Sequence, residues 1–97
     1  MPNEILIIVS KDALTIQIKR MHKYISEANE VNNNSSYESL NFAKLTLANG
    51  RGIYICLKGL GLLSEDEITG ENIDRVQKKI DYILEEKRRK DLPKWKH

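Results

Sequence analysis

The sequence contains one cysteine, Cys56, so no disulfide can form within the chain. Cys56 lies in an apolar run from Ile53 to Leu57, and we expect it to be a buried thiol in a protein of a reducing compartment. Aromatic residues are also scarce, at 6% of 97 residues. A chain of this length buries only about 60–65% of its unfolded surface. The core is therefore predicted to be thin, and pairing with a second copy or another protein would add buried apolar area.

Groups that carry catalysis are equally few. The two histidines are His22, at the edge of an apolar stripe, and His97, the last residue. No cysteine or histidine spacing fits a zinc site, and the glycines follow no phosphate-loop pattern. The acidic residues Glu65 to Glu67 are adjacent in sequence and fit a helix start better than a cation site. We therefore expect no enzymatic activity, no cofactor and no metal.

The sequence also lacks long apolar runs. A membrane span needs about 20 consecutive apolar residues, and no segment approaches that length. The start of the chain has no basic region, and the apolar run from Ile5 to Val9 is shorter than a signal-peptide core. We expect a cytoplasmic protein without a membrane partner. The net charge of +2 is too small to indicate nucleic-acid binding by itself.

Helical periodicity dominates what is present. Residues 11–29 place Leu14, Ile18, Met21, Ile25 and Ala28 at steps of 4, 3, 4 and 3, with Ser10 as the expected N-cap. A last helix is predicted from Thr69, with Ile73, Val76, Ile80 and Ile83 at steps of 3, 4 and 3. Acidic residues lie near the start of this helix, and a basic run lies at its end, before Pro93. The helix dipole favours this order of charges.

Two segments allow alternatives. Glu4 to Ser10 is β-branched and apolar, which favours a short strand or an irregular arm, although Ile7 continues the stripe of the following helix. Residues 37–60 favour a helix, broken near Asn49 to Gly52, but Asn49-Gly50 is also a strong hairpin signal. The sequence thus predicts a mainly α fold, a small bundle of three to four helices with a short N-terminal strand as an option. The alternative is an α+β chain of order β-α-β-β-α.

The end of the middle segment resembles a pattern in small helical proteins of phages and prophages. The matching run extends from Gly52 to Glu67, where a helix ends in Leu60-Gly61-Leu62-Leu63-Ser64 and acidic residues follow. Gly61 is the expected helix stop, and Ser64 to Glu67 the expected capping box of the next helix. The run covers about a sixth of the chain and implies no functional residue. The resemblance implies a helical fold and a phage or mobile-element origin, and products of such genes are often small proteins that modulate a host protein.

Taken together, residues 1–97 are predicted to form one domain, with 91–97 as a basic C-terminal tail. The first functional hypothesis is a protein-binding module that docks on a host protein complex, such as a defence system, and modulates or inhibits it. A nucleic-acid-binding regulator that uses the tail is the alternative, and a virion structural or assembly protein is a third. The expected partner-binding residues are Lys87, Arg88, Arg89, Lys90, Lys94, Trp95 and Lys96. The residues expected to pair in a homodimer are Leu14, Ile18, Met21, Ile25, Ile73, Val76, Ile80 and Ile83.

Overall fold

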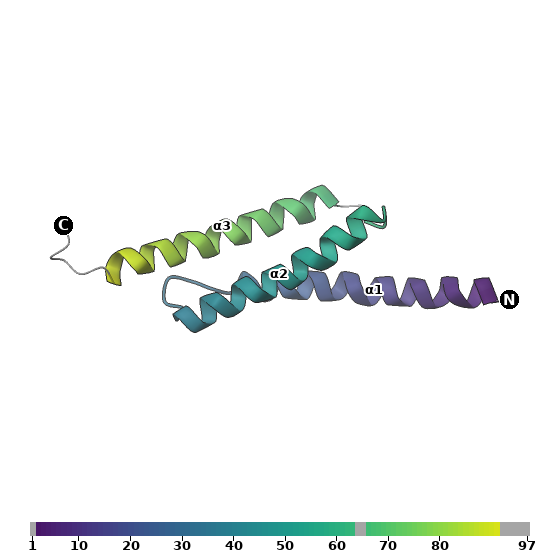
Figure 1. Ribbon diagram of the computed structural model, residues 1–97, viewed down its shortest axis with the longest axis horizontal. Helices are drawn as coiled ribbons and strands as arrows, with labels where there is room; N and C mark the ends of the chain where they lie inside the picture. The colour runs from purple at the N-terminus through teal and green to yellow at the C-terminus, as the bar shows by residue number, and fades with distance from the viewer. Residues whose placement is uncertain (1, 64–65, 92–97) are drawn as a thin grey trace.

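A computed structural model describes residues 2–63 and 66–91 of the chain, with side-chain burial described for residues 12–63 and 68–91. It contains three helices, α1 (Pro2–Ala28), α2 (Tyr37–Gly59) and α3 (Asp66–Asp91), joined by short connections (Figure 1). The predicted mainly α fold is confirmed, and no strand occurs in the described ranges. The β-α-β-β-α alternative is therefore wrong.

The first helix is longer than predicted. Glu4 to Ser10 belong to α1, so the predicted strand or irregular arm and the Ser10 N-cap are both wrong. A proline is tolerated in the first helical turn, where its missing N–H has no intrahelical partner in any case. The β-branched residues that follow lower helix propensity only slightly, and Ile7 continues the helical stripe. The stripe periodicity therefore decided the structure of this segment.

The middle helix runs unbroken through Asn49-Gly50. It begins after Ser36, whose Oγ accepts a hydrogen bond from the backbone N–H of Ser39 at 3.1 Å. At its end, Gly61 has φ +69°, its N–H donates to the Lys58 carbonyl, and the N–H of Leu62 donates to the Leu57 carbonyl. This pair of bonds is a Schellman motif. Gly61 is thus confirmed as the helix stop, and the hairpin is excluded.

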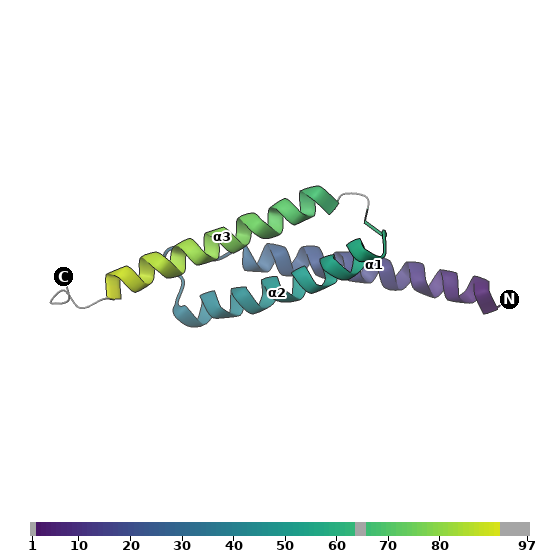
Figure 2. The same ribbon diagram turned by 45° about the horizontal axis from the view of Figure 1, so that its top comes forward.

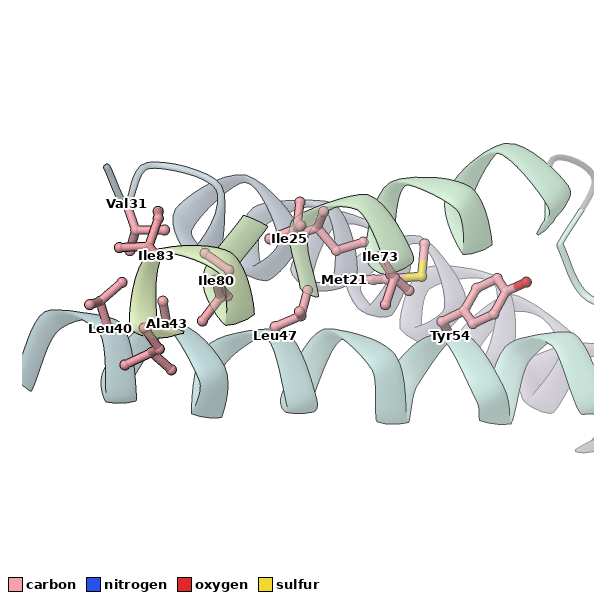
Figure 3. Close-up of a cluster of buried hydrophobic side chains, with 13 residues drawn as sticks. Met21, Ile25, Val31, Leu40, Ala43, Leu47, Tyr54, Ile73, Ile80 and Ile83 are labelled. Atoms are coloured by element: carbon pink, nitrogen blue, oxygen red, sulfur yellow. The ribbon is translucent and has the colours of Figure 1, made fainter. Parts of the chain in front are cut away.

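The core lies on the inner face of α2, which packs against both α1 and α3, while α1 and α3 contact each other much less (Figures 1 and 2). Figure 3 shows the buried side chains meeting between the three helices. Gly50 is buried at the α1–α2 crossing, where an added Cβ would lie 3.3 Å from the Cβ of Tyr24. The core residues are Met21, Ile25, Ala28, Val31, Leu40, Ala43, Leu47, Tyr54, Ile73, Val76, Ile80, Ile83 and Leu84.

The bundle is elongated, measuring 72 × 22 × 17 Å along its principal axes. Its radius of gyration is 18.0 Å, against about 13 Å for a compact domain of 100 residues. Both ribbon views show that the helices are staggered. The N-terminal part of α1 extends well past the neighbouring ends of α2 and α3, and at the opposite end α3 extends past the start of α2 (Figures 1 and 2).

Candidate interaction surfaces

The side of α2 that faces away from the core forms a continuous exposed strip, which we call the outer face. Its residues recur at steps of 3, 4, 3, 4 and 3, the spacing of a coiled-coil seam. Phe42 and Leu45 are about two-thirds exposed, at 65% and 66%. Large apolar side chains that are this accessible and share one helix face mark interaction sites. The outer face consists of Phe42, Leu45, Asn49, Gly52, Cys56 and Gly59, all of them exposed.

The outer face carries no charge, although 31% of the chain is charged. The cationic residues of α2, Lys44, Arg51 and Lys58, follow one another at intervals of seven on another side of the helix. That side is turned toward α3, because Arg51 Nη1 donates to Gln77 Oε1 at 3.5 Å. Lys58 lies over the Tyr54 ring at 5.6 Å from its centroid. From Phe42 to Gly59 the helix thus has a charged side and an uncharged one, and the exposed Glu38, four residues before Phe42, places one negative charge at the start of the same series.

A shallow hollow of about 490 Å³ opens along the C-terminal half of the outer face. Gly52 leaves open space there, since an added Cβ would meet nothing within 4 Å. Cys56 is exposed at the same hollow, so the prediction of a buried thiol is wrong. Residues 53–57 are all apolar, and only the helical period decides which of them point inward. The lining residues are Gln17, Ala48, Asn49, Gly52, Ile53, Cys56 and Leu57.

The residues expected to pair in a homodimer divide into two groups. Met21, Ile25, Ile73, Val76, Ile80 and Ile83 are buried in the core of the chain itself. Leu14 and Ile18 lie nearer the N-terminal end of α1 and are only half-buried. Burial of the α1 stripe therefore decreases from Met21 toward Leu14, before the N-terminal end of the helix is reached. Ile16 is also exposed on this part of α1.

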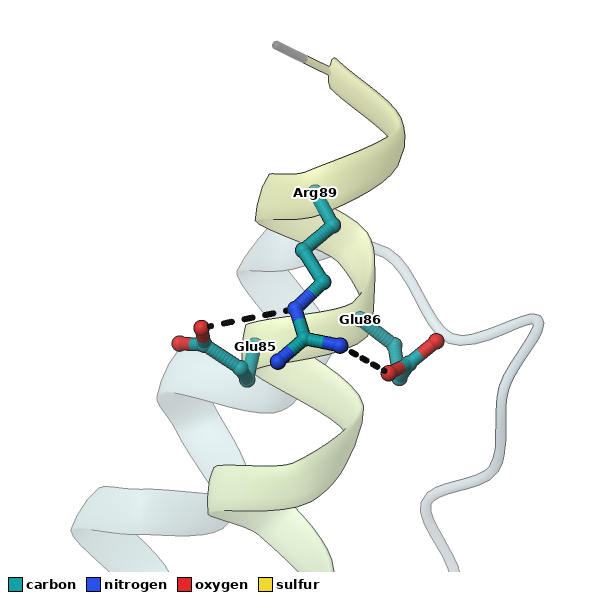
Figure 4. Close-up of polar contacts among 3 residues, drawn as sticks. All are labelled: Glu85, Glu86 and Arg89. Carbon is teal, nitrogen blue, oxygen red and sulfur yellow. Dashed lines mark ion pairs between the residues drawn. The ribbon is translucent and has the colours of Figure 1, made fainter.

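The basic residues from Lys87 to Lys90 belong to α3 and do not form a separate tail. Arg89 lies between two carboxylates, with Nε 3.7 Å from Glu85 and Nη1 3.5 Å from Glu86 (Figure 4). The ammonium of Lys87 lies 5.1 Å from the ring centroid of Tyr37. This end of α3 is therefore engaged in local contacts and is not a uniformly cationic surface. Lys94, Trp95 and Lys96 lie outside the described residues.

Tyr37 connects the start of α2 to the end of α3. Its hydroxyl donates a hydrogen bond of 2.5 Å to Asp91 Oδ2. This bond raises the pKa of Tyr37 above its ordinary value, with smaller contributions from desolvation and from the charge of Asp91. The phenol is at the surface, and the contact joins the start of α2 to the end of α3.

The side chains that could bind a metal ion are scattered over the described part of the chain. Within it, no three His, Cys, Asp or Glu side chains are arranged to hold a metal ion. A hollow of about 890 Å³ is bordered by Glu27, Glu30 and Glu38 beside Phe42 and Val31. No described helix combines the length and hydropathy needed to cross a bilayer. What the described surface offers is apolar contact area.

Comparisons with known proteins identify no relative in which these surfaces could be compared. No protein-family model matches the chain, and neither curated proteins nor solved structures gave a significant match.

The sequence analysis predicted a helix for residues 37–60 and did not identify the outer face of α2. The missing signal is present in the sequence as a second series, from Phe42 to Gly59, offset from the buried one. Two of its members are glycines and one is asparagine, so hydrophobicity alone does not show it. The heptad spacing together with the absence of charge would have revealed it.

Proposed function

We propose that this protein is a small non-enzymatic binding module that docks on another protein through the N-terminal part of α1. The observation that carries this proposal is the extension of α1 past the other two helices (Figures 1 and 2). Within the described residues, no other helix runs beside that part of α1. Its sequence from Ile5 to Val9 is nevertheless apolar. An apolar helix without a neighbour in its own bundle is suited to enter a groove of a partner.

The half-burial of Leu14 and Ile18 supports the same reading. Both residues belong to the stripe that packs Met21 and Ile25 into the core, yet both retain accessible surface. In the sequence, Ile7 continues this stripe seven residues before Leu14, and such spacing suits residues that anchor a helix in a groove. A partner groove that receives the extended part would also cover Leu14 and Ile18.

The partner we propose is a host protein or protein complex, with the chain encoded by a phage or mobile element. The resemblance of Gly52 to Glu67 to small phage and prophage proteins motivates this class. A cytoplasmic site of action and modulation or inhibition of a host machine, such as a defence system, follow from the same proposal. The acidic residues Glu85, Glu86 and Asp91 argue against the alternative of a nucleic-acid regulator, because they offset part of the positive charge at the end of α3.

Removal of residues 2–10 tests the docking role. Full-length protein, the truncated form and a Tyr82→Ala control would each be used to capture partners from a bacterial lysate, and any partner would then be purified. We expect a purified partner to bind the full-length chain and the Tyr82→Ala control equally, since Tyr82 is exposed on α3. Binding to the truncated form should fall at least about a hundredfold, because several apolar anchors are lost together. The melting temperature should change little, since the deleted part lies outside the bundle.

Removal of residues 92–97 tests the alternative and leaves the bond between Tyr37 and Asp91 in place. If this deletion abolishes partner binding while removal of residues 2–10 does not, the docking site is not on α1. Tight binding of DNA or RNA by the full-length protein at about 150 mM salt, lost in this deletion, would favour the nucleic-acid regulator. A steep decrease of that binding with added salt would confirm contacts to phosphates.

A further inference from the structure

The six positions of the outer face of α2 are large in one half and small in the other, and the exposed Ile55 and Leu60 flank the small half. Phe42 and Leu45 project near the start of the helix, whereas Gly52, Cys56 and Gly59 follow toward its end. The hollow of about 490 Å³ lies over this second half. A surface with knobs at one end and a hollow at the other is complementary to a second copy of itself that is turned around.

We propose that two copies of the chain form an antiparallel dimer through their outer faces. In the register where paired residue numbers sum to 101, Phe42 lies opposite the partner's Gly59 and Leu45 lies opposite the partner's Cys56. Asn49 then lies opposite the partner's Gly52. Every layer therefore sets a larger side chain against a smaller one, as in knobs-into-holes packing. A parallel pair would set Phe42 against Phe42 and Gly52 against Gly52, which crowds one end and leaves a gap at the other.

The charge and the length of the outer face agree with a second copy of the chain as its partner. The outer face and the flanking positions Asn41, Thr46, Ala48, Ile53, Ile55 and Leu60 are uncharged, so two identical copies meet without repulsion. From Phe42 to Gly59 the seam extends for about 26 Å at 1.5 Å per residue. The two Asn49 side chains lie on either side of the two-fold axis, about 4.5 Å apart along the helices, and each amide offers a donor and an acceptor to the other. A polar residue inside an otherwise apolar seam specifies its register.

The dimer goes beyond the docking role of α1 and does not depend on it. The N-terminal part of α1 extends past the C-terminal end of α2 (Figure 1). Antiparallel pairing of α2 places these two extensions at opposite ends of the dimer. The assembly would therefore present two docking helices, and a partner with two grooves would be bound with higher avidity than by one chain.

Cysteine crosslinking tests the register. The variant Leu45→Cys retains Cys56, and in the proposed register each new thiol lies opposite the partner's Cys56. Oxidised glutathione should then convert the pure protein to a covalent dimer. Within one chain the two thiols are about 16 Å apart along the helix, too far for a disulfide. The wild-type protein and the double variant Leu45→Cys/Cys56→Ser should both stay uncrosslinked, since their single thiols are about 16 Å apart in the dimer.

The outcomes separate the possible arrangements. Crosslinking of either single-thiol protein would show a parallel pair, in which each thiol faces its own copy, and would overturn the proposal. Sedimentation supplies a second test, with the wild-type chain expected above its monomer mass of 11.2 kDa at micromolar concentrations. Gly52→Glu should raise the dimer dissociation constant about a hundredfold or more, because it places a carboxylate in the seam. It should remain folded, since position 52 has open space and glutamate favours helix over glycine. A wild-type protein that stays at 11.2 kDa throughout would overturn the dimer.

Discussion

Gly50 and Gly52 are two residues apart in α2, and they have opposite environments. Gly50 is buried where α1 crosses, and an added Cβ would lie 3.3–3.4 Å from Tyr24, Ile25 and the Met21 carbonyl. Gly52 points to the outer face, and an added Cβ there would meet nothing within 4 Å. The first glycine permits close packing within the chain, whereas the second leaves a hollow at its surface. One helix therefore has two distinct apolar faces, of which only one belongs to the core.

The largest effect is expected from substitutions of Leu47 and Leu45, because Leu47 lies on the inner face of α2 and Leu45 on the outer face. Leu47 is fully buried in the core, and Leu45 is 66% exposed on the outer face. Leu47→Asp should unfold the protein, since an unpaired carboxylate in the core costs several kcal/mol, a large part of a small domain's stability of about 5–15 kcal/mol. Leu45→Asp should retain the helical circular-dichroism spectrum, and its free energy of unfolding should lie within about 1 kcal/mol of the wild-type value.

The two variants should be compared at low protein concentration, where association contributes little to the measured stability. If Leu45→Asp unfolded the chain as completely as Leu47→Asp, the outer face would be part of the core. Equal tolerance of both variants would show that the inner face of α2 is assigned wrongly.

Sequence periodicity was enough for the core and not for the surface. The buried positions from Met21 to Ala28 and from Ile73 to Ile83 follow from helical steps of three and four. The favoured helix over residues 37–60 is confirmed, and the predicted break at Asn49 to Gly52 and the alternative hairpin are wrong. The hairpin preference of Asn49-Gly50 is local, whereas the packing of α1 onto Gly50 is a tertiary contact that stabilises helix. The N-terminal segment misled the prediction because β-branched residues suit a strand but tolerate a helix.

The interaction surfaces were less accessible to sequence reasoning. Met21, Ile25 and the stripe of α3 have the spacing of a dimer seam, but that spacing is the same whether the facing helix belongs to the same chain or to another. Only the fold shows that these residues are used internally. Conversely, Cys56 looks buried in a run of apolar neighbours until the helix period is fixed through the whole of α2.

The next largest effect is expected at Gly50 itself. Gly50→Leu should destabilise the protein by about 1–3 kcal/mol, because the larger side chain must displace Tyr24 or Ile25 at the helix crossing. Gly52→Leu is the matched control, and it should not lower monomer stability, since leucine enters open space and favours helix. Chemical denaturation of both variants at low concentration measures the difference. Equal destabilisation at the two positions would mean that α1 does not cross at Gly50.

A smaller effect separates Gly52 from Gly61. Gly61→Ala should cost about 1 kcal/mol, because alanine is strained at the left-handed φ of +69° in the Schellman turn. Gly52→Ala should instead stabilise the monomer by about 0.5–1 kcal/mol, since alanine loses less conformational entropy than glycine in a helix. Thermal melts of the two variants should therefore shift in opposite directions. A gain of stability in Gly61→Ala would show that the chain does not end α2 with this turn.

The smallest change in stability is expected from the exposed hydrogen bond between Tyr37 and Asp91. It contrasts a surface contact with the buried contacts of the core. The pKa of Tyr37 is raised above its ordinary value of 10.0, chiefly by donation to the Asp91 carboxylate. The bond therefore stabilises the protein fully below about pH 10, and this contribution is lost as the pH rises through the higher pKa of the folded state. Tyr37→Phe should reduce stability slightly near neutral pH, and its difference from the wild-type protein should vanish in strongly alkaline solution. Denaturation curves of both proteins across this pH range test the sign. A difference that grew with rising pH would mean that the ionised phenol is the stabilised form, which a donor to a carboxylate cannot be.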